Sequence, residues 1–329
     1  MKIADLRRFA LCGLAASLAA GCAGGTQAVG VPSAVAQRPA LEPGHPGVLP
    51  DSFRRGIYVA TSFGTTILGY RANNSKNRPP ICTVHGAYAP NGVAADSDGN
   101  LIDPDGSSTI TIFKGPKMCG RKLGSIHDQY GPPTDASSVH AATGTIAVAS
   151  IFKPSGGGSI AVCTLAGGCT KNLRIASMYE VAGVALAANG DCWASATNSA
   201  GVALLTYFKG CSRSGQTATG FQNSYYGGLD IDGEGHLLAI SAFDGNLYVY
   251  NGCNPGCSLV GGPYSLQGEA VFGHLNKKST EFATADFVTG SVDVYAYTPK
   301  KIAYLYSFNN GLSSSLEPLG VTYNFRANR

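Results

Sequence analysis

The amino-acid sequence predicts an all-β protein, a six-bladed β-propeller built from four-stranded blades. Three observations predict this fold. A strand–turn–strand pattern recurs six times at intervals of about 45 residues, further strand-like runs follow the copies, and the two ends of the repeat region resemble complementary parts of one blade. A fixed period of this length is typical of propeller blades.

The clearest copy spans residues 90–101, where a short apolar strand, a turn that contains Gly99 and a second strand follow one another. Weaker copies occupy residues 138–141, 183–186, 228–231, 270–272 and 320–323. Each copy contains one apolar residue that serves as its anchor: Val93, Val139, Val184, Leu229, Val271 and Val321. The steps between successive anchors are 46, 45, 45, 42 and 50 residues. Six copies at this period indicate six blades.

Strand-like runs of alternating polarity follow the copies, for example at residues 245–250 and 290–297. They bring the expected number of strands to four per repeat, as in propeller blades. Residues 56–60 look like a second strand without its first, and residues 320–324 look like a first strand without its second. We therefore expect the two ends to complete one blade, which removes the exposed sheet edges that invite pairing with other chains.

The run at residues 90–101 resembles an NHL-type repeat, and residues 54–329 as a whole are similar to the six-bladed NHL and SMP-30/gluconolactonase-like propellers. This superfamily includes lactonases, lyases and noncatalytic interaction modules, so the resemblance implies an architecture and not an activity. Two departures stand out. Asp103 and Pro104 interrupt the second blade where the family usually continues its second strand, and the third blade is only weakly recognisable.

The N-terminus predicts export. In residues 1–21 a basic start with Lys2, Arg7 and Arg8 precedes the apolar run at residues 9–20, as in a signal peptide. This run is shorter than the roughly 20 residues that span a bilayer. Residues 18–22 resemble the lipobox of bacterial lipoproteins, in which Cys22 is lipid-modified and becomes the mature N-terminus. The alternative is an ordinary secretory signal in which Cys22 is incidental.

Residues 22–53 are rich in Pro, Gly and Ala, and we expect a flexible linker between the lipid and the propeller at residues 54–329. The predicted location is the bacterial cell envelope, with the membrane bound through the N-terminal lipid. Only 13% of the residues are charged and the formal net charge is +4, so the sequence shows no footprint for nucleic acid. We expect a monomer with a protein or small-molecule ligand.

Eight cysteines follow Cys22, and an even number in an exported chain indicates disulfides. Local spacing favours two short bridges, Cys163 with Cys169 and Cys253 with Cys257. The remaining four fit the pairs Cys82 with Cys119 and Cys192 with Cys211, although other connectivities are compatible with the sequence. The spacing lacks the paired two-residue gaps of zinc sites.

Residues 96–100 begin like a calcium-binding loop, but they lack its later glycine and bidentate glutamate. A similar run follows at residues 230–234, in the same place within its repeat. This recurrence favours a hairpin turn. The chain contains no Gly-x-Ser-x-Gly elbow, phosphate-binding loop or His-Glu-x-x-His pair, and its histidines are scattered.

One set of positions predicts a binding site. The segment that enters the innermost strand of a blade lies at the mouth of the channel, so the residues four before each anchor are expected to converge on the top face. They are Ala89, Asp135, Glu180, Tyr225, Gln267 and Glu317, and Asn91 and Glu269 lie two residues before their anchors. Their oxygens suit a divalent cation, the one cofactor that we consider. The alternative is a set of solvated loop acids.

SMP-30-like enzymes hold a divalent metal at the comparable place, but their set of one Glu, two Asn and one Asp is not matched here position by position, so no catalytic role is carried over. The sequence favours a noncatalytic cell-envelope module that binds a ligand or protein at its top face. The alternative is a metal-dependent lactonase or hydrolase in which the ion polarises a carbonyl or activates water.

Overall fold

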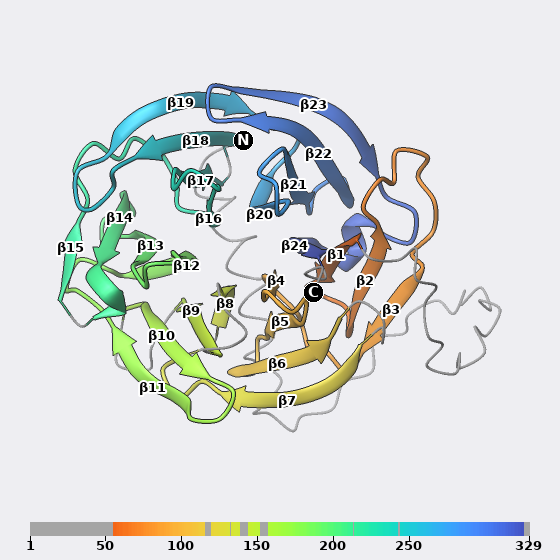
Figure 1. Cartoon of the computed structure of the whole chain (residues 1–329), viewed down its shortest axis with the longest axis horizontal. Coiled ribbons are helices and arrows are strands. Elements are labelled where there is room, and N and C mark those ends of the chain that lie inside the picture. Colours follow the sequence, from red (N-terminus) through yellow and green to blue (C-terminus); the bar gives the residue numbers. More distant parts are fainter. Residues whose placement is uncertain are drawn as a thin grey trace, which may run out of the picture. The chain divides into compact units, whose positions relative to one another are not determined.

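The computed structural model describes residues 55–325 except 116–119, 132, 139–143, 152–156, 213 and 243. The signal peptide, Cys22 and the linker therefore lie outside the described residues. Those residues form 24 strands in six four-stranded antiparallel sheets. The predicted six-bladed β-propeller is confirmed (Figure 1).

The blades are numbered I to VI, each from its innermost strand outward. Blade I contains β24 (Pro318–Phe325), β1 (Arg55–Thr61), β2 (Thr66–Arg71) and β3 (Cys82–His85). Blade II contains β4 (Ala94–Ala95), β5 (Leu101–Pro104), β6 (Thr109–Lys114) and β7 (Arg121–His127). Blade III contains β8 (Pro133–Ser138), β9 (Thr145–Ser150), β10 (Ser159–Thr164) and β11 (Gly168–Leu173).

Blade IV contains β12 (Glu180–Leu186), β13 (Cys192–Thr197), β14 (Ala203–Phe208) and β15 (Gly215–Thr217). Blade V contains β16 (Leu229–Ile231), β17 (Leu237–Ser241), β18 (Asn246–Asn251) and β19 (Ser258–Ser265). Blade VI contains β20 (Ala270–Leu275), β21 (Glu281–Asp286), β22 (Ser291–Thr298) and β23 (Lys301–Phe308). Two short 3-10 helices, η2 (Lys209–Cys211) and η3 (Ser314–Leu316), lie between strands. No helix of the described residues is long and apolar enough to cross a membrane.

The innermost strands form a closed ring, because each contacts the next in the order β24, β4, β8, β12, β16, β20 and back to β24. Blade I joins the two ends of the described chain. Its innermost strand β24 pairs with β1, with Arg55 opposite Phe325 and Val59 opposite Val321. The expectation that the two ends complete one blade is therefore confirmed. Asp103 and Pro104 do not break the second blade, since β5 includes both and pairs with β6.

Apolar residues that alternate along the strands hold neighbouring blades together. Leu101 of blade II is buried in a cluster with Tyr58 of blade I, whereas the next residue, Ile102, is buried in a cluster with Ile146 of blade III. Successive side chains of a strand point to opposite faces, so each blade packs against both neighbours. Burial of this apolar surface is the main stabilising term of such a ring.

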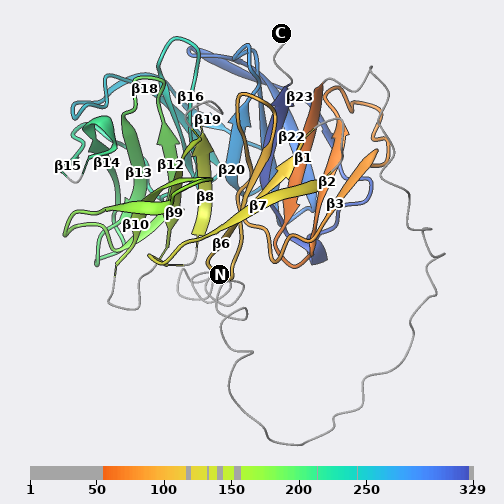
Figure 2. The ribbon, with the colours of Figure 1, turned by 60° about the horizontal axis from the view of Figure 1, so that its bottom comes forward.

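The four-stranded pattern gives the ring two different edges. At one edge lie the turns between second and third strands and the connections from one blade to the next, and we call this edge the crossover face. Hydrogen bonds join these two kinds of segment, for example from Ser62 N to Glu317 O at 2.9 Å and from Tyr179 N to Thr197 O at 2.7 Å. In Figure 2, β24 ends at the upper edge of the ring, so the crossover face is the lower one.

The opposite edge carries the turns between first and second strands. Asp96 Oδ1 accepts hydrogen bonds from Asp98 N at 2.9 Å and Asn100 N at 2.8 Å. Asp232 Oδ1 does the same with Glu234 N at 2.9 Å and His236 N at 2.8 Å. Both carboxylates therefore close hairpin turns, as expected. The equivalent of Asp96 is Asp232, two residues after the start of the run at 230–234.

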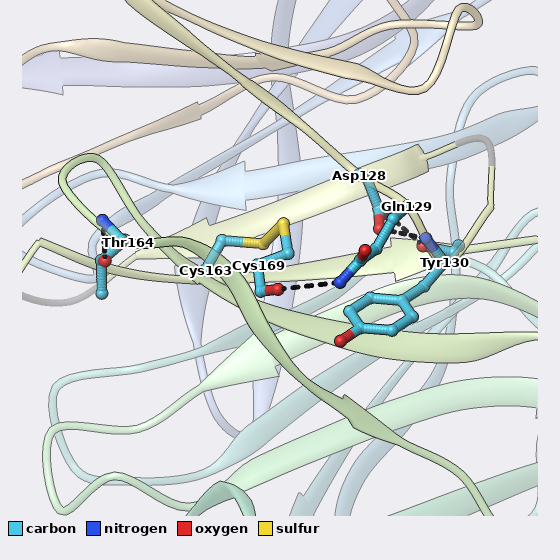
Figure 3. Close-up of a disulfide and its surroundings, with 8 residues drawn as sticks. Asp128, Gln129, Tyr130, Cys163, Thr164 and Cys169 are labelled. Carbon is cyan, nitrogen blue, oxygen red and sulfur yellow. Dashed lines mark hydrogen bonds between the residues drawn. A yellow bond between two sulfur atoms is a disulfide. The ribbon is translucent and has the colours of Figure 1, made fainter.

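Three of the four predicted disulfides are confirmed: Cys163–Cys169, Cys192–Cys211 and Cys253–Cys257. Cys119 lies outside the described residues, so the bridge to Cys82 stays a prediction. Figure 3 shows the Cys163–Cys169 bridge between β10 and β11, where Gln129 Nε2 of the connection from blade II donates to Cys169 O at 3.4 Å. The bridges are compatible with an exported protein.

Candidate functional site

The crossover face holds the residues that the sequence singles out for a site. Glu180 is the first residue of β12, Gln267 and Glu269 lie in the connection from blade V to blade VI, and Glu317 lies just before β24. Asn91 lies in the connection from blade I to blade II. The sequence predicts that these residues lie at the entries to innermost strands. The order of the strands along the chain places them there.

Asp135 is out of register with the others. Pro133 pairs with the end of the second strand of its blade, at Ser150, as Pro318 does with Thr61 and Pro90 with Asp105. Asp135 is thus two residues further along β8 than the strand entry. Its side chain lies outside the described part of the structure.

The side chain of Asn91 is buried and makes hydrogen bonds within the protein. It is only 5% exposed. Its Nδ2 donates to Pro133 O at 3.2 Å, and its Oδ1 accepts from Ser62 Oγ at 3.4 Å. These bonds tie the segment that enters blade II to blade I through Ser62 and to blade III through Pro133. An unpaired amide in this buried position would be costly.

Glu180 has a tyrosine partner from the next blade connection. Tyr226 Oη donates to Glu180 Oε2 at 2.8 Å. The connection that carries Tyr226 is itself fixed, since Gly227 N donates to Ser195 Oγ at 3.1 Å and Tyr225 N donates to Ser241 Oγ at 3.0 Å. A half-buried carboxylate is therefore held at the start of blade IV and oriented by a neutral donor.

A second group of acids lies in blade VI at its boundary with blade V. Asp286 is buried at the end of β21 and accepts hydrogen bonds from Glu269 N, Val288 N and Thr289 Oγ1 at 3.3, 2.9 and 2.6 Å. Gly268 makes room for this carboxylate, because a Cβ built on Gly268 would overlap it. Burial raises the pKa of Glu269, and the charge of Asp286 adds to the rise.

No sequence pattern pointed to Asp293, which lies on the neighbouring strand β22. Its side chain is 3% exposed, and Oδ2 has no hydrogen-bond partner within the described part of the chain. Burial, followed by the charge of Asp286, raises the pKa of Asp293 to about 7. Asp103 of β5 is comparable, since burial and then Asp105 raise its pKa well above the ordinary value. Loss of hydration disfavours the charged form of a carboxyl, so both acids tend to hold their protons.

Glu317 directly follows η3 and has the left-handed conformation, with φ of 45°. Its carbonyl accepts from Ser62 N, and the carbonyl of Ala89, whose φ is 44°, accepts from Gly106 N at 3.3 Å. Blades I and II thus share one turn geometry at their entry. Burial raises the pKa of the Glu317 carboxyl.

The crossover face also carries exposed apolar side chains. Ten large apolar side chains are exposed among the described residues, and five of them lie in segments of this face. These five are Phe63, Tyr88, Tyr179, Val202 and Val288, which are 46% to 59% exposed. Of the other five, four lie on outermost strands and one in a turn between outer strands: Leu123, Leu259, Tyr304, Leu305 and Leu165. The opposite edge near the axis presents polar turns instead.

The charges on the crossover face are mostly negative. Its described turns, connections and bordering strand ends carry seven carboxylates, one arginine and no lysine. The carboxylates are Asp105, Asp128, Glu180, Asp244, Glu269, Asp286 and Glu317. The arginine is Arg174, and Lys153 lies outside the described residues. No three His, Cys, Asp or Glu side chains of the described part are gathered as a metal ion would require.

The comparisons with known proteins agree on the fold. One similar solved chain is from the crystal structure of a nidogen/laminin complex, with 15% identity and a TM-score of 0.64 over 83% of this chain and 99% of that chain. Another is the WD40 β-propeller domain of Doa1, with 13% identity and a TM-score of 0.52 over 71% of this chain and 73% of that chain. No protein-family model and no curated protein matches the sequence. At these identities the likeness shows a β-propeller and nothing finer.

Proposed function

We propose that this protein is an exported, lipid-anchored binding module that holds a partner on its crossover face and carries out no catalysis itself. The exposed apolar side chains on that face are the observation that supports the proposal. Water-exposed aromatic residues gathered on one side of a rigid scaffold are typical of interaction sites. Tyr88 and Tyr179 supply such side chains from connections fixed by neighbouring blades.

Two likenesses point in the same direction. The repeat at residues 90–101 resembles NHL-type repeats, whose superfamily includes noncatalytic interaction modules. One structurally similar chain was crystallised in a protein–protein complex, that of nidogen and laminin. A propeller suits this role because its closed ring keeps the loops of one face in fixed positions.

Site-specific cross-linking tests the binding role. A photoreactive amino acid replaces Tyr88 or Tyr179 on the crossover face, and Tyr304 or Leu305 on the outermost strand β23 serves as the control because these residues are similarly exposed. We expect cells that produce the protein to yield one specific adduct from the crossover positions and none from β23. Equal adducts from both sets would contradict the proposed binding face.

Membrane fractionation tests the anchor separately. Cys22→Ser removes the acceptor thiol and leaves the propeller sequence unchanged. We expect the wild-type chain in the membrane fraction and the variant in the soluble exported fraction, because acyl chains supply the membrane affinity of a lipoprotein. An unchanged distribution would contradict lipidation at Cys22, whatever the outcome of cross-linking.

A further inference from the structure

We propose that the partner of the crossover face is a cationic polypeptide segment, whose Lys and Arg side chains pair with Glu180, Asp244, Glu269 and Glu317 and lie against the exposed aromatic rings. This inference rests on the proposed binding role of the face and names the chemistry of its partner.

Among the described residues, no Lys or Arg neutralises the negative charge of the face. Three of its carboxylates, Asp105, Asp128 and Asp286, are buried and accept hydrogen bonds. The other four are half-buried at the surface, and none has an ion pair with a Lys or Arg of the described part. Burial raises the pKa of Glu269 and of Glu317. A cation brought beside a carboxylate of this kind relieves the cost of its burial, because opposite charge favours the ionised form.

The aromatic side chains match the same partner. Phe63, Tyr88 and Tyr179 are each about half exposed on this face. Tyr179 directly precedes Glu180 in the sequence, so the entry of blade IV carries both an aromatic residue and a carboxylate. Arg and Lys are attracted to the faces of aromatic rings, and the attraction adds to an ion pair with a neighbouring acid.

The rest of the molecule does not attract cations in the same way. Without residues 1–21, which carry Lys2, Asp5, Arg7 and Arg8, the formal charge of +4 becomes +2. The turns of the opposite edge mix acids with bases, for example Asp98 and Glu234 with Lys277 and Lys278. A polycation is therefore repelled by the average charge of the protein and attracted by one face. Such an arrangement steers a charged partner to that face.

Fluorescence anisotropy with a labelled octa-arginine peptide tests the inference, with octa-glutamate and a neutral Gly-Ser peptide of equal length as comparison probes. The double variant E180Q and E317Q removes two carboxylates from the crossover face. The matched control, D98N and E234Q, makes the same change in net charge at exposed positions of the opposite edge. Circular dichroism melting establishes that each variant folds, and E317Q alone serves if the double variant does not.

We expect octa-arginine to bind the wild-type protein, with an affinity that falls as salt rises. The crossover double variant should bind about tenfold more weakly and the control within about twofold, because two partly buried ion pairs together account for roughly one decade of affinity. Tyr88→Ala should weaken binding, and Tyr304→Ala should not. Equal weakening in both double variants, or binding of octa-glutamate or the neutral peptide, overturns the inference. A cross-linked partner on the crossover face that octa-arginine fails to displace also overturns it but leaves the proposed function intact.

Discussion

The phenol of Tyr226 donates a hydrogen bond of 2.8 Å to Glu180 Oε2, and so links the connection between blades IV and V to the innermost strand of blade IV. Tyr226→Phe removes this bond and keeps the ring. We expect the free energy of unfolding to fall by about 1 kcal/mol, as for a partly exposed hydrogen bond. Urea denaturation measures the change. Tyr304→Phe is the control, and an equal loss there would show that the phenol of Tyr226 contributes nothing specific.

Because the pKa of Asp293 is raised in the folded protein, we expect the stability of the protein to depend on pH. This pKa is raised from 3.8 to about 7 in the folded protein, so the folded state binds more protons than the unfolded state between these values. Stability from this group is therefore fully present below about pH 4 and is lost as the pH rises through about 7. Asp293→Asn should equal the wild type at pH 4 and exceed it at pH 8, by at most about 4 kcal/mol at about 1.4 kcal/mol for each pKa unit.

The measurement is urea denaturation of both proteins at several pH values from 4 to 8. Asp98→Asn, which changes an exposed acid, is the control and should leave the pH profile unchanged. Parallel profiles for the wild type and the Asp293 variant would show that Asp293 has an ordinary pKa in the folded state.

Replacement of Gly268 by alanine adds one methyl group and is expected to lower the stability of the fold strongly. The φ of Gly268 is +64°, and a Cβ there would overlap the buried Asp286 carboxylate. Gly235 has φ of +88° but no atom within 4 Å of a Cβ. Gly235→Ala should therefore cost about 1 kcal/mol for the left-handed backbone alone, and Gly268→Ala about 3 kcal/mol because overlap in a packed site is added. Thermal denaturation distinguishes them, and equal losses would contradict the steric account.

The disulfides are expected to differ in their contributions. Cys192 and Cys211 are separated by 19 residues, and Cys253 and Cys257 by 4. In the chain-entropy model the longer loop gives about 3 kcal/mol and the shorter about 2 kcal/mol. Alanine at both positions of each bridge, measured by urea denaturation, should reproduce this order. The reverse order would indicate that local packing outweighs loop length.

The repeat made the fold predictable, because the anchors mark the innermost strands. Val184, Leu229, Val271 and Val321 all lie within such strands, and Val93 directly precedes one. Register within a blade was less predictable. The amino-acid sequence of residues 230–234 resembles that of residues 96–100, which suggests that Asp230 corresponds to Asp96. The carboxylate that closes the turn is instead that of Asp232, because the hairpin is defined by hydrogen bonds to the backbone and not by the order of the acids.

The candidate site was predictable only in part. Glu180, Glu269 and Glu317 were found because they precede the anchors, and the chain order of the strands places them on one face. Asp286 and Asp293 were missed as a group because only the pairing of β21 with β22 brings them near one another, with Asp286 opposite Ser291 and Asp293 opposite Thr284. Asn91 was a candidate cation ligand because asparagine carries an amide oxygen. In the structure its Nδ2 donates to Pro133 O, and no local sequence pattern reveals this contact because the two residues are 42 positions apart.

The pairing of β24 with β1 also bears on how the molecule is made. During synthesis β24 emerges after every other strand, yet it supplies the innermost strand of the first blade. Until then β1 keeps an open edge and the apolar cluster that contains Ile57, Val321 and Tyr323 is incomplete. Ring closure therefore follows the release of β24, so a growing chain that still lacks this strand cannot form the closed ring.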